Sequence, residues 1–286
     1  MVVTSIQVYP VKSLAGLGVP EGEVEPWGLR HDRRWLVLSP DGGVLTARER
    51  PQMLGIRATP LDHGAIELTG RGGSAVVVEA PVDGELLPTA LSRLESVRAA
   101  GREADDWLSL ELGEPVRLGW LDDPRRRTVS AEHGGQHGDV LSLADAGPLL
   151  LTTTASLRKL NDWVGEEAAA RGEQPAAPLV MDRFRPNIVL HGVDAPFVED
   201  TWSTVRIGNI EFRFAEHCDR CVLTTIDPRT LAQGKEPLRT LARHRKRGGK
   251  TYFGVRLVPL TTGRLRVGDT VTVTRVGKNG GVFRVQ

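Results

Sequence analysis

The sequence predicts a mixed α+β fold that is rich in β-strands. Short stretches of alternating apolar and polar residues recur along the chain, the first over residues 2–8, and this pattern is typical of half-buried strands. The 32 glycines and 18 prolines indicate many turns and favour a β-rich chain over a helix bundle. With 286 residues, the chain is long enough for one large domain or two modest ones.

The first hundred residues are predicted to form a strongly bent antiparallel sheet or a small barrel. The strand over 2–8 runs into a turn with Lys12 and Ser13, where an ammonium and a hydroxyl could meet an anion; a solvated turn is the simpler interpretation. A second strand follows Asp32-Arg33-Arg34 and leads to a hairpin turn at Asp41-Gly42-Gly43. Further short strands are expected over residues 55–59, 65–68 and 75–78.

The middle of the chain carries the clearest helical pattern. Apolar residues at helical spacing over 102–112 predict one amphipathic helix. The basic run over 125–127 follows a turn. Such a run is usually a solvated loop, although it could also line an anion site.

The second half combines strands with a hydroxyl-rich helix start. A strand beginning at Leu149 runs into Thr153 and Thr154, which predict a helix N-terminus. Such an N-terminus can bind an anion, or the threonines can be ordinary caps. Another strand is expected over 188–190, and a hairpin over 204–214 leads directly into a cysteine motif.

The only two cysteines, Cys218 and Cys221, form a Cys-x-x-Cys motif that contains Arg220. A thioredoxin-type redox pair would precede a helix, whereas residues 222–226 are β-prone and close on Asp227-Pro228. A structural zinc site needs four ligands, and the sequence offers no second motif of this kind. Two buried, inert thiols are the simplest interpretation. The adjacent arginine instead favours a thiolate at the start of a strand, which can act as a nucleophile or a soft metal ligand.

Composition and charge exclude several classes of protein. A formal net charge of +1 does not suggest nucleic-acid binding. No apolar run approaches the length of a membrane span, and the N-terminal strand pattern lacks the features of a signal peptide. Two cysteines do not make a disulfide framework, so the expected location is the reducing cytoplasm.

Four junctions between a loop and a strand carry similar chemistry. Arginine side chains bind phosphate through two parallel hydrogen bonds, and a hydroxyl or amide beside them adds further contacts. These junctions are Lys12-Ser13, Asp32-Arg33-Arg34, Arg183-Phe184-Arg185-Pro186-Asn187 and Asp219-Arg220-Cys221. In a chain of nearly zero net charge, this grouping suggests one anionic ligand beside a thiolate.

The same motifs carry a resemblance to a known family. They read Tyr-Pro-Val-Lys-Ser-Leu at 9–14, Gly-Leu-Arg-His-Asp-Arg-Arg-Trp at 28–35, Arg-Phe-Arg-Pro-Asn-Ile at 183–188 and Cys-Asp-Arg-Cys-Val-Leu-Thr-Thr-Ile-Asp-Pro at 218–228. Together they resemble the MOSC-domain proteins of the YcbX and mitochondrial amidoxime-reducing component family. The resemblance implies a MOSC N-terminal β-barrel domain over residues 1–122 and a MOSC β-barrel domain over residues 123–286.

The resemblance also implies a molybdenum cofactor, in which a molybdopterin carries the metal. Cys221 matches the catalytic residue whose sulfur binds molybdenum, and Cys218 is then an accessory cysteine. The residues implied to bind the cofactor are Lys12, Ser13, Arg33, Thr153, Thr154, Arg185, Asn187, Asp219 and Arg220.

The implied reaction is the reductive removal of oxygen from small N-hydroxylated compounds, such as N-hydroxylated bases and amidoximes. The sequence ends without a cysteine-rich ferredoxin domain, so a separate electron-donor protein of the ferredoxin or flavoprotein type is expected. An alternative from another class is a sulfur carrier or sulfurtransferase that holds a persulfide on Cys221. Neither a nucleic acid nor a membrane is an expected partner.

Overall fold

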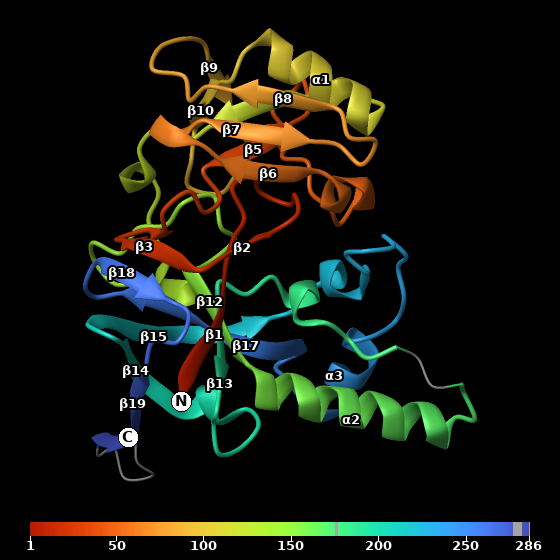
Figure 1. Ribbon diagram of the computed structural model, residues 1–286, viewed down its shortest axis with the longest axis vertical. Coiled ribbons are helices and arrows are strands. Elements are labelled where there is room, and N and C mark those ends of the chain that lie inside the picture. Colours follow the sequence, from red (N-terminus) through yellow and green to blue (C-terminus); the bar gives the residue numbers. More distant parts are fainter. Residues whose placement is uncertain (175–176, 277–281, 286) are drawn as a thin grey trace. The chain divides into compact units, whose positions relative to one another are not determined.

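The computed structural model describes residues 1–174, 177–276 and 282–285 (Figure 1). Strands dominate it, and three of the described segments are α-helices. These are α1 (Arg102–Leu112), α2 (Thr154–Ala170) and α3 (Leu238–His244). The predicted mixed α+β, β-rich class is therefore confirmed. None of the described helices combines the length and the apolar character needed to cross a membrane.

The chain divides into two compact units, and each unit is discontinuous in sequence. Unit 1 combines residues 1–7, 18–26 and 147–286. Unit 2 combines residues 8–17 and 27–146. The first strand of the chain thus belongs to the same unit as the cysteine motif.

Unit 1 is built on one ten-stranded sheet. In pairing order its strands are β2 (Leu17–Val19), β1 (Val2–Val8), β13 (Ile188–His191), β12 (Leu149–Thr153), β17 (Lys250–Pro259), β15 (Ile210–Asp219), β14 (Trp202–Ile207), β19 (Val271–Val276) and β20 (Val282–Val285), with β16 (Lys246–Arg247) attached to β17. β12 and β13 run parallel, with Leu151 opposite Ile188, and α2 lies between them in sequence. They form a β-α-β crossover, as a parallel pair requires. Separately, β3 (Glu21–Glu25) pairs with β18 (Gly263–Arg266).

The core of unit 1 follows from its apolar strands and helix faces. All five residues of β12 are buried, as expected of a strand that is covered on both faces. Leu160 of α2, Leu241 of α3 and Phe253 of β17 belong to one buried cluster with Phe184. The rings of Phe184 and Phe253 stack with their centroids 4.0 Å apart. This packing holds the segment around Phe184 beside the sheet.

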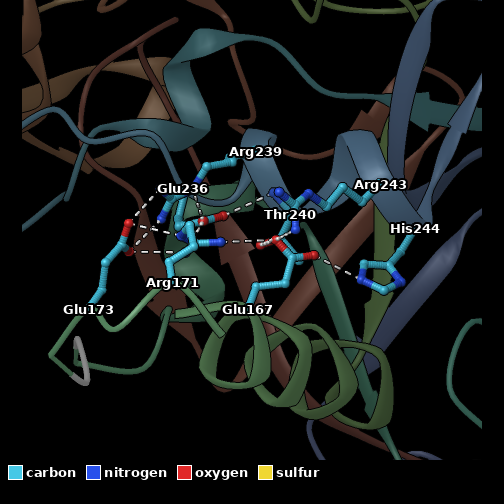
Figure 2. A network of polar contacts seen from close by, with 8 residues as sticks. All are labelled: Glu167, Arg171, Glu173, Glu236, Arg239, Thr240, Arg243 and His244. Atoms are coloured by element: carbon cyan, nitrogen blue, oxygen red, sulfur yellow. Dashed lines mark hydrogen bonds and ion pairs between the residues drawn. The ribbon is translucent and has the colours of Figure 1, made fainter. Parts of the chain in front are cut away.

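A network of ion pairs joins α2 to α3 (Figure 2). Glu167 of α2 is buried, and its carboxylate lies 3.0 Å from His244 Nε2 and 3.3 Å from Arg243 Nη1. Arg239 of α3 reaches Glu173, which also binds Arg171. Because several cations share these carboxylates, the network orients α3, which precedes β17 in the chain.

Unit 2 contains two separate sheets and one helix. One sheet has the order β5 (Trp35–Leu38), β11 (Arg117–Trp120), β10 (Ser96–Ala99) and β9 (Leu86–Pro88). The other has the order β6 (Arg57–Pro60), β7 (Ile66–Thr69) and β8 (Ala75–Val78), and a two-residue strand, β4 (Gly28–Leu29), precedes them all. α1 packs against β8 and β11. The hairpin pattern was correctly predicted, but no sheet closes into a barrel among the described strands, because each pairing order ends at two edges.

Candidate functional site

Cys221 lies just beyond the end of β15. The strand ends at Asp219, and Cys221 then caps a 3₁₀ turn over Val222–Thr225. Its side chain is exposed, and neither cysteine is in a disulfide. The sulfur of Cys221 is therefore accessible to a metal or a small molecule.

The strand predicted over residues 222–226 is not formed, and this prediction was wrong. The hydroxyl of Thr224 donates to the Cys221 carbonyl at 2.9 Å, and that of Thr225 donates to the Val222 carbonyl at 2.7 Å. These local bonds reach back three residues and stabilise a turn, so they outweigh the β-propensity of the side chains. Cys221 thus precedes a turn rather than a strand.

The other cysteine lies in a different environment. Cys218 is only 4% exposed, and Arg220 Nη1 donates to its sulfur at 2.8 Å. Arg220 Nη2 donates to the carbonyl oxygen of Phe184 at 2.7 Å. The guanidinium of Arg220, which directly precedes Cys221 in sequence, therefore contacts the sulfur of Cys218 and the loop that contains Phe184.

Two loops are tied together beside Cys221. Besides the bond from Arg220 to Phe184, Arg183 Nη2 lies 2.6 Å from Asp227 Oδ2. Arg185 directly follows Phe184, so the structure brings the loop of Arg185 against the cysteine motif. The grouping of these two junctions, which sequence alone could only suggest, is thus present in unit 1.

Arg256 of β17 is a residue of this site that sequence reasoning missed. It pairs with Glu216 and lies 3.0 Å from Asp219 Oδ1, while Lys250 Nζ lies 3.4 Å from Asp219 Oδ2. Burial would raise the pKa of Asp219, but Arg256 and Lys250 outweigh it and hold that pKa below its usual value. The only sequence signal was strand alternation, which did not show that Arg256 and Asp219 are neighbours.

The side chain of Asn187, which directly precedes β13, forms hydrogen bonds to both β12 and β1. Its Oδ1 accepts from Leu150 N at 3.1 Å, and its Nδ2 donates to the Gln7 carbonyl at 3.1 Å. The side chain is 1% exposed. These contacts give Asn187 a structural task at the end of the loop that carries Arg185.

The two predicted threonines differ. Thr153 is buried and caps α2, since its Oγ1 accepts from Ser156 N at 3.1 Å, and the Oγ1 of Thr153 also bonds Ser156 Oγ at 2.8 Å. Thr154 begins the helix, and its Oγ1 lies 3.0 Å from His191 Nδ1. The ordinary capping interpretation therefore accounts for Thr153.

The helix cap also holds a buried acid, Glu199. Ser156 Oγ donates to its Oε1 at 2.6 Å, and burial raises the pKa of Glu199 to about 7. The folded protein therefore keeps a proton that the unfolded chain releases near pH 4.5, so stability falls as the pH rises from about 4.5 to about 7. Urea unfolding at pH 5 and pH 8 should show Glu199→Gln removing a difference on the order of 3 kcal/mol. An unchanged pH dependence in this variant would show that Glu199 is ionised in the folded protein.

Lys12, Ser13 and Arg33 lie in unit 2. Lys12 Nζ donates to the Leu143 carbonyl at 3.0 Å and pairs with Asp145. Arg33 Nη1 donates to Asp32 Oδ2 at 2.5 Å, and its guanidinium lies 4.4 Å from the centroid of the Tyr9 ring. The structure thus groups these cations within unit 2, each with a carboxylate partner.

Three of the predicted residues share an unusual backbone conformation. Ser13, Arg33 and Arg185 have φ angles of 69°, 49° and 55°. Residues other than glycine rarely adopt positive φ, and where they do, the strain often marks a binding site. No residue type in the sequence signals this feature, because none of the three is glycine or asparagine.

The residues of unit 1 are compatible with a metal that is bound as part of a cofactor. Among the described residues, no three His, Cys, Asp or Glu side chains group as a metal site. The exposed Cys221 could supply a soft sulfur ligand to a metal whose other ligands come from a cofactor. Arg185 and Arg220, on the adjoining loops, could add positive charge beside an anionic cofactor.

Comparison with known proteins identifies the family of this chain. The sequence profile of the MOSC N-terminal beta barrel domain matches residues 1–115, and that of the MOSC domain matches residues 138–272. Mitochondrial amidoxime-reducing component 1 of Mus musculus is 32% identical over 94% of this chain and 81% of that protein. The chain belongs to the MOSC family that includes these proteins. The boundary predicted between residues 122 and 123 stays a prediction.

Other relatives of this MOSC protein carry two kinds of name. Mitochondrial amidoxime-reducing component 1 of Homo sapiens is 31% identical over 94% of this chain and 82% of that protein. Molybdenum cofactor sulfurase of Danio rerio is 32% identical over 89% of this chain but only 31% of that protein. The similarity therefore extends to a reductive and to a sulfur-handling branch.

Proposed function

We propose that this MOSC protein is a molybdenum-cofactor-dependent oxidoreductase that reduces N-hydroxylated compounds such as N-hydroxylated bases and amidoximes. The observation that carries the proposal is the exposed Cys221 sulfur beside a loop that is tied to the motif through Arg220. Similarity to the amidoxime-reducing components along most of their length supports the same reaction class.

The proposal gives each predicted site residue a role. In this proposal Cys221 ligates the metal, and Lys12, Ser13, Arg33, Arg185 and Arg220 attract and orient the anionic parts of the cofactor. Thr153, Thr154, Asn187 and Asp219 complete the proposed set of cofactor-binding residues, and of these Thr153 also caps α2 while Asn187 also bonds Leu150 N and the Gln7 carbonyl. When bound, the cofactor supplies the two-electron redox chemistry, while the protein supplies position and electrostatics.

The remaining parts of the proposal concern partners and location. A small N-hydroxylated molecule is the substrate, and a separate ferredoxin- or flavoprotein-type donor brings the electrons. We propose a cytoplasmic location, because two cysteines do not make the disulfide framework of a small secreted protein.

Metal and cofactor analysis tests this function. Protein from a molybdenum-replete host should contain molybdenum and a fluorescent pterin, and it should reduce an N-hydroxylated base with an artificial reductant. Bound cofactor without any reduction would indicate a storage protein instead.

A second candidate is a sulfur carrier that holds a persulfide on Cys221. The similarity to the sulfurase of Danio rerio and the exposure of the Cys221 sulfur favour it. Cyanide-labile sulfur on protein that contains no molybdenum would support the carrier and overturn the reductase.

A further inference from the structure

A basic segment, residues 243–250, covers the end of α3 and the hairpin that follows it in unit 1. It reads Arg-His-Arg-Lys-Arg-Gly-Gly-Lys, with three arginines, two lysines and no acidic residue. Arg247 of β16 pairs with Lys250 of β17 across Gly248 and Gly249, whose φ angles are 53° and 82°. Two successive residues with positive φ form the tight turn that joins antiparallel strands. In a chain with a net charge of +1, this segment concentrates positive charge in one place.

The base of the hairpin is held firmly by Arg245. This arginine is 10% exposed, pairs with Asp200, and places its guanidinium 4.3 Å from the centroid of the Phe197 ring. Its carbonyl accepts a hydrogen bond from Tyr252 N at 3.1 Å. Because these contacts order the hairpin in advance, binding a partner to it costs little conformational entropy.

The other cations of the basic segment are exposed to solvent. The side chains of Arg243 and Arg247 are each 59% exposed, and that of Lys250 is 57% exposed. Lys246 is exposed as well. Clustered cations of this kind attract an oppositely charged surface and speed its association.

The nearby acids neutralise these exposed cations only in part. Three carboxylates lie within ion-pair distance of them, at 3.3, 3.6 and 3.4 Å, and these belong to Glu167, Asp200 and Asp219. Each carboxylate is shared with a further arginine, in the same order Arg171, Arg245 and Arg256. The basic segment therefore keeps positive charge that is available to a partner.

The basic segment adjoins the cysteine motif. Thr251 directly follows Lys250, and its carbonyl accepts from Arg220 N at 2.8 Å. Cys221 is the next residue along the chain and is exposed, and Val222 after it is an apolar residue that is 38% exposed. Exposed cations, an exposed sulfur and an exposed apolar side chain are thus only a few residues apart across paired segments of unit 1.

We propose that the basic segment is the docking surface for an electron-donor protein that carries an acidic patch around its redox group. The inference rests on the proposed function and names how its donor is recognised. Removal of oxygen from one N–OH group consumes two electrons, which the donor supplies as it is oxidised, and two protons from solvent, and it yields an N–H bond and water. A one-electron donor must therefore dock twice per turnover, which suits a small, charge-steered interface that releases quickly.

The position of the basic segment favours a donor protein over other anionic partners. A membrane that contains anionic lipids would attract the same cations. The segment is, however, bonded directly to the motif that carries Cys221, where the proposed redox centre is held. An electron donor is the partner that has to come close to that centre.

The test uses the full chain and two probes, an acidic [2Fe–2S] ferredoxin and an acidic flavodoxin. Lys246→Gln combined with Arg247→Gln removes two exposed charges, while Asp200 keeps Arg245 as its partner. Calorimetric titration with the oxidised probes requires no turnover. At low salt the double variant should bind at least one probe about tenfold more weakly than the parent, and added salt should weaken the parent more than the variant.

Kinetics provide the second measurement. With the reduced form of the same probe, kcat/KM of the double variant should fall by about the same factor of ten as its affinity. Reduction of an N-hydroxylated base with a small artificial reductant should be unchanged, because a small reductant does not need the docking surface.

Arg264→Gln combined with Arg266→Gln is the matched control. These arginines of β18 are 60% and 56% exposed and both pair with Glu21, so the control removes the same charge from unit 1. Gly263 lies beside Ile210, at the opposite end of β15 from the cysteine motif. This variant should bind both probes as the parent does. Equal weakening in the two double variants would show that net charge, rather than the basic segment, attracts the donor.

Other outcomes would also overturn the docking surface. These are a parent protein that binds neither probe and a Lys246→Gln/Arg247→Gln variant that binds as tightly as the parent. If the parent bound vesicles with anionic lipid but neither probe, the basic segment would be a membrane-binding element instead.

The artificial reductant distinguishes this failure from failure of the proposed function. If replete protein reduces an N-hydroxylated base with that reductant while the Lys246→Gln/Arg247→Gln variant keeps full donor affinity, only the docking surface is refuted. If a probe binds through the basic segment while replete protein contains no molybdenum, the docking surface stands and only the proposed function is refuted.

Discussion

Cys221→Ala is expected to abolish both molybdenum retention and reduction of N-hydroxylated substrates, while its free energy of unfolding stays within about 0.5 kcal/mol of the parent. The side chain is exposed, so its loss leaves no cavity. The sulfur is nevertheless the ligand that the proposed metal needs from the protein. Metal analysis of purified protein and urea unfolding together check both halves of this expectation.

Cys218→Ala is the matched control within the same motif. Its sulfur is buried and accepts a hydrogen bond from Arg220, so the change should cost about 1–3 kcal/mol of stability. At temperatures well below unfolding, the variant should still contain molybdenum. If both variants lost the metal and neither lost stability, the two cysteines would act as a redox pair and Cys221 would not be the ligand.

Arg127→Met is expected to destabilise the protein by about 3 kcal/mol or more. Its guanidinium donates to the carbonyls of Ser92, Ser142 and Ala144, and methionine fills part of the space without replacing any donor. Burial lowers the pKa of Arg127 to about 10, which shows that placing a charge there has a cost of its own. Leaving the carbonyls of Ser142 and Ala144 without donors costs more, because both residues are buried. Urea unfolding measures the difference.

Arg126→Met is the comparison for this effect. Arg126 is adjacent in sequence and pairs with Asp122 at 2.7 Å, but its side chain is 32% exposed. Its replacement should change stability by less than about 1 kcal/mol, since solvent screens a partly exposed ion pair. Similar losses in the two variants would mean that the charge of the basic run, rather than the carbonyl contacts of Arg127, stabilises the loop.

The parts of the fold that were predictable depend on local pattern. The helix over 102–112 and the hairpin that delivers the cysteine motif follow from side-chain periodicity and from the Gly208-Asn209 turn. The turn over Val222–Thr225 did not follow, because hydroxyl-to-carbonyl bonds compete with β-propensity and no periodicity records them. The burial of Arg127 was also hidden, since its carbonyl partners come from distant parts of the chain.

The sequence identified the residue types of the candidate site but not the contacts between them. Motifs identified Cys221, Arg185 and Arg220 as a chemical group. The sequence could not show that Arg220 reaches Cys218 and Phe184, because side-chain direction depends on how β15 ends. Arg256 escaped notice for a related reason, since its closeness to Asp219 arises only through the pairing of β15 with β17.

The discontinuity of unit 1 matters to anyone who wishes to dissect this protein. A truncated product starting at residue 123 would lack β1 and β3, so β13 would lose the neighbour that places Ile6 opposite Ile188, and β18 would lose its partner. Uncovered strand edges recruit other chains and lead to aggregates. An excised half that carries the cysteine motif must therefore bring residues 1–7 and 18–26 with it, by circular permutation or by co-expression, before its chemistry can be studied in isolation.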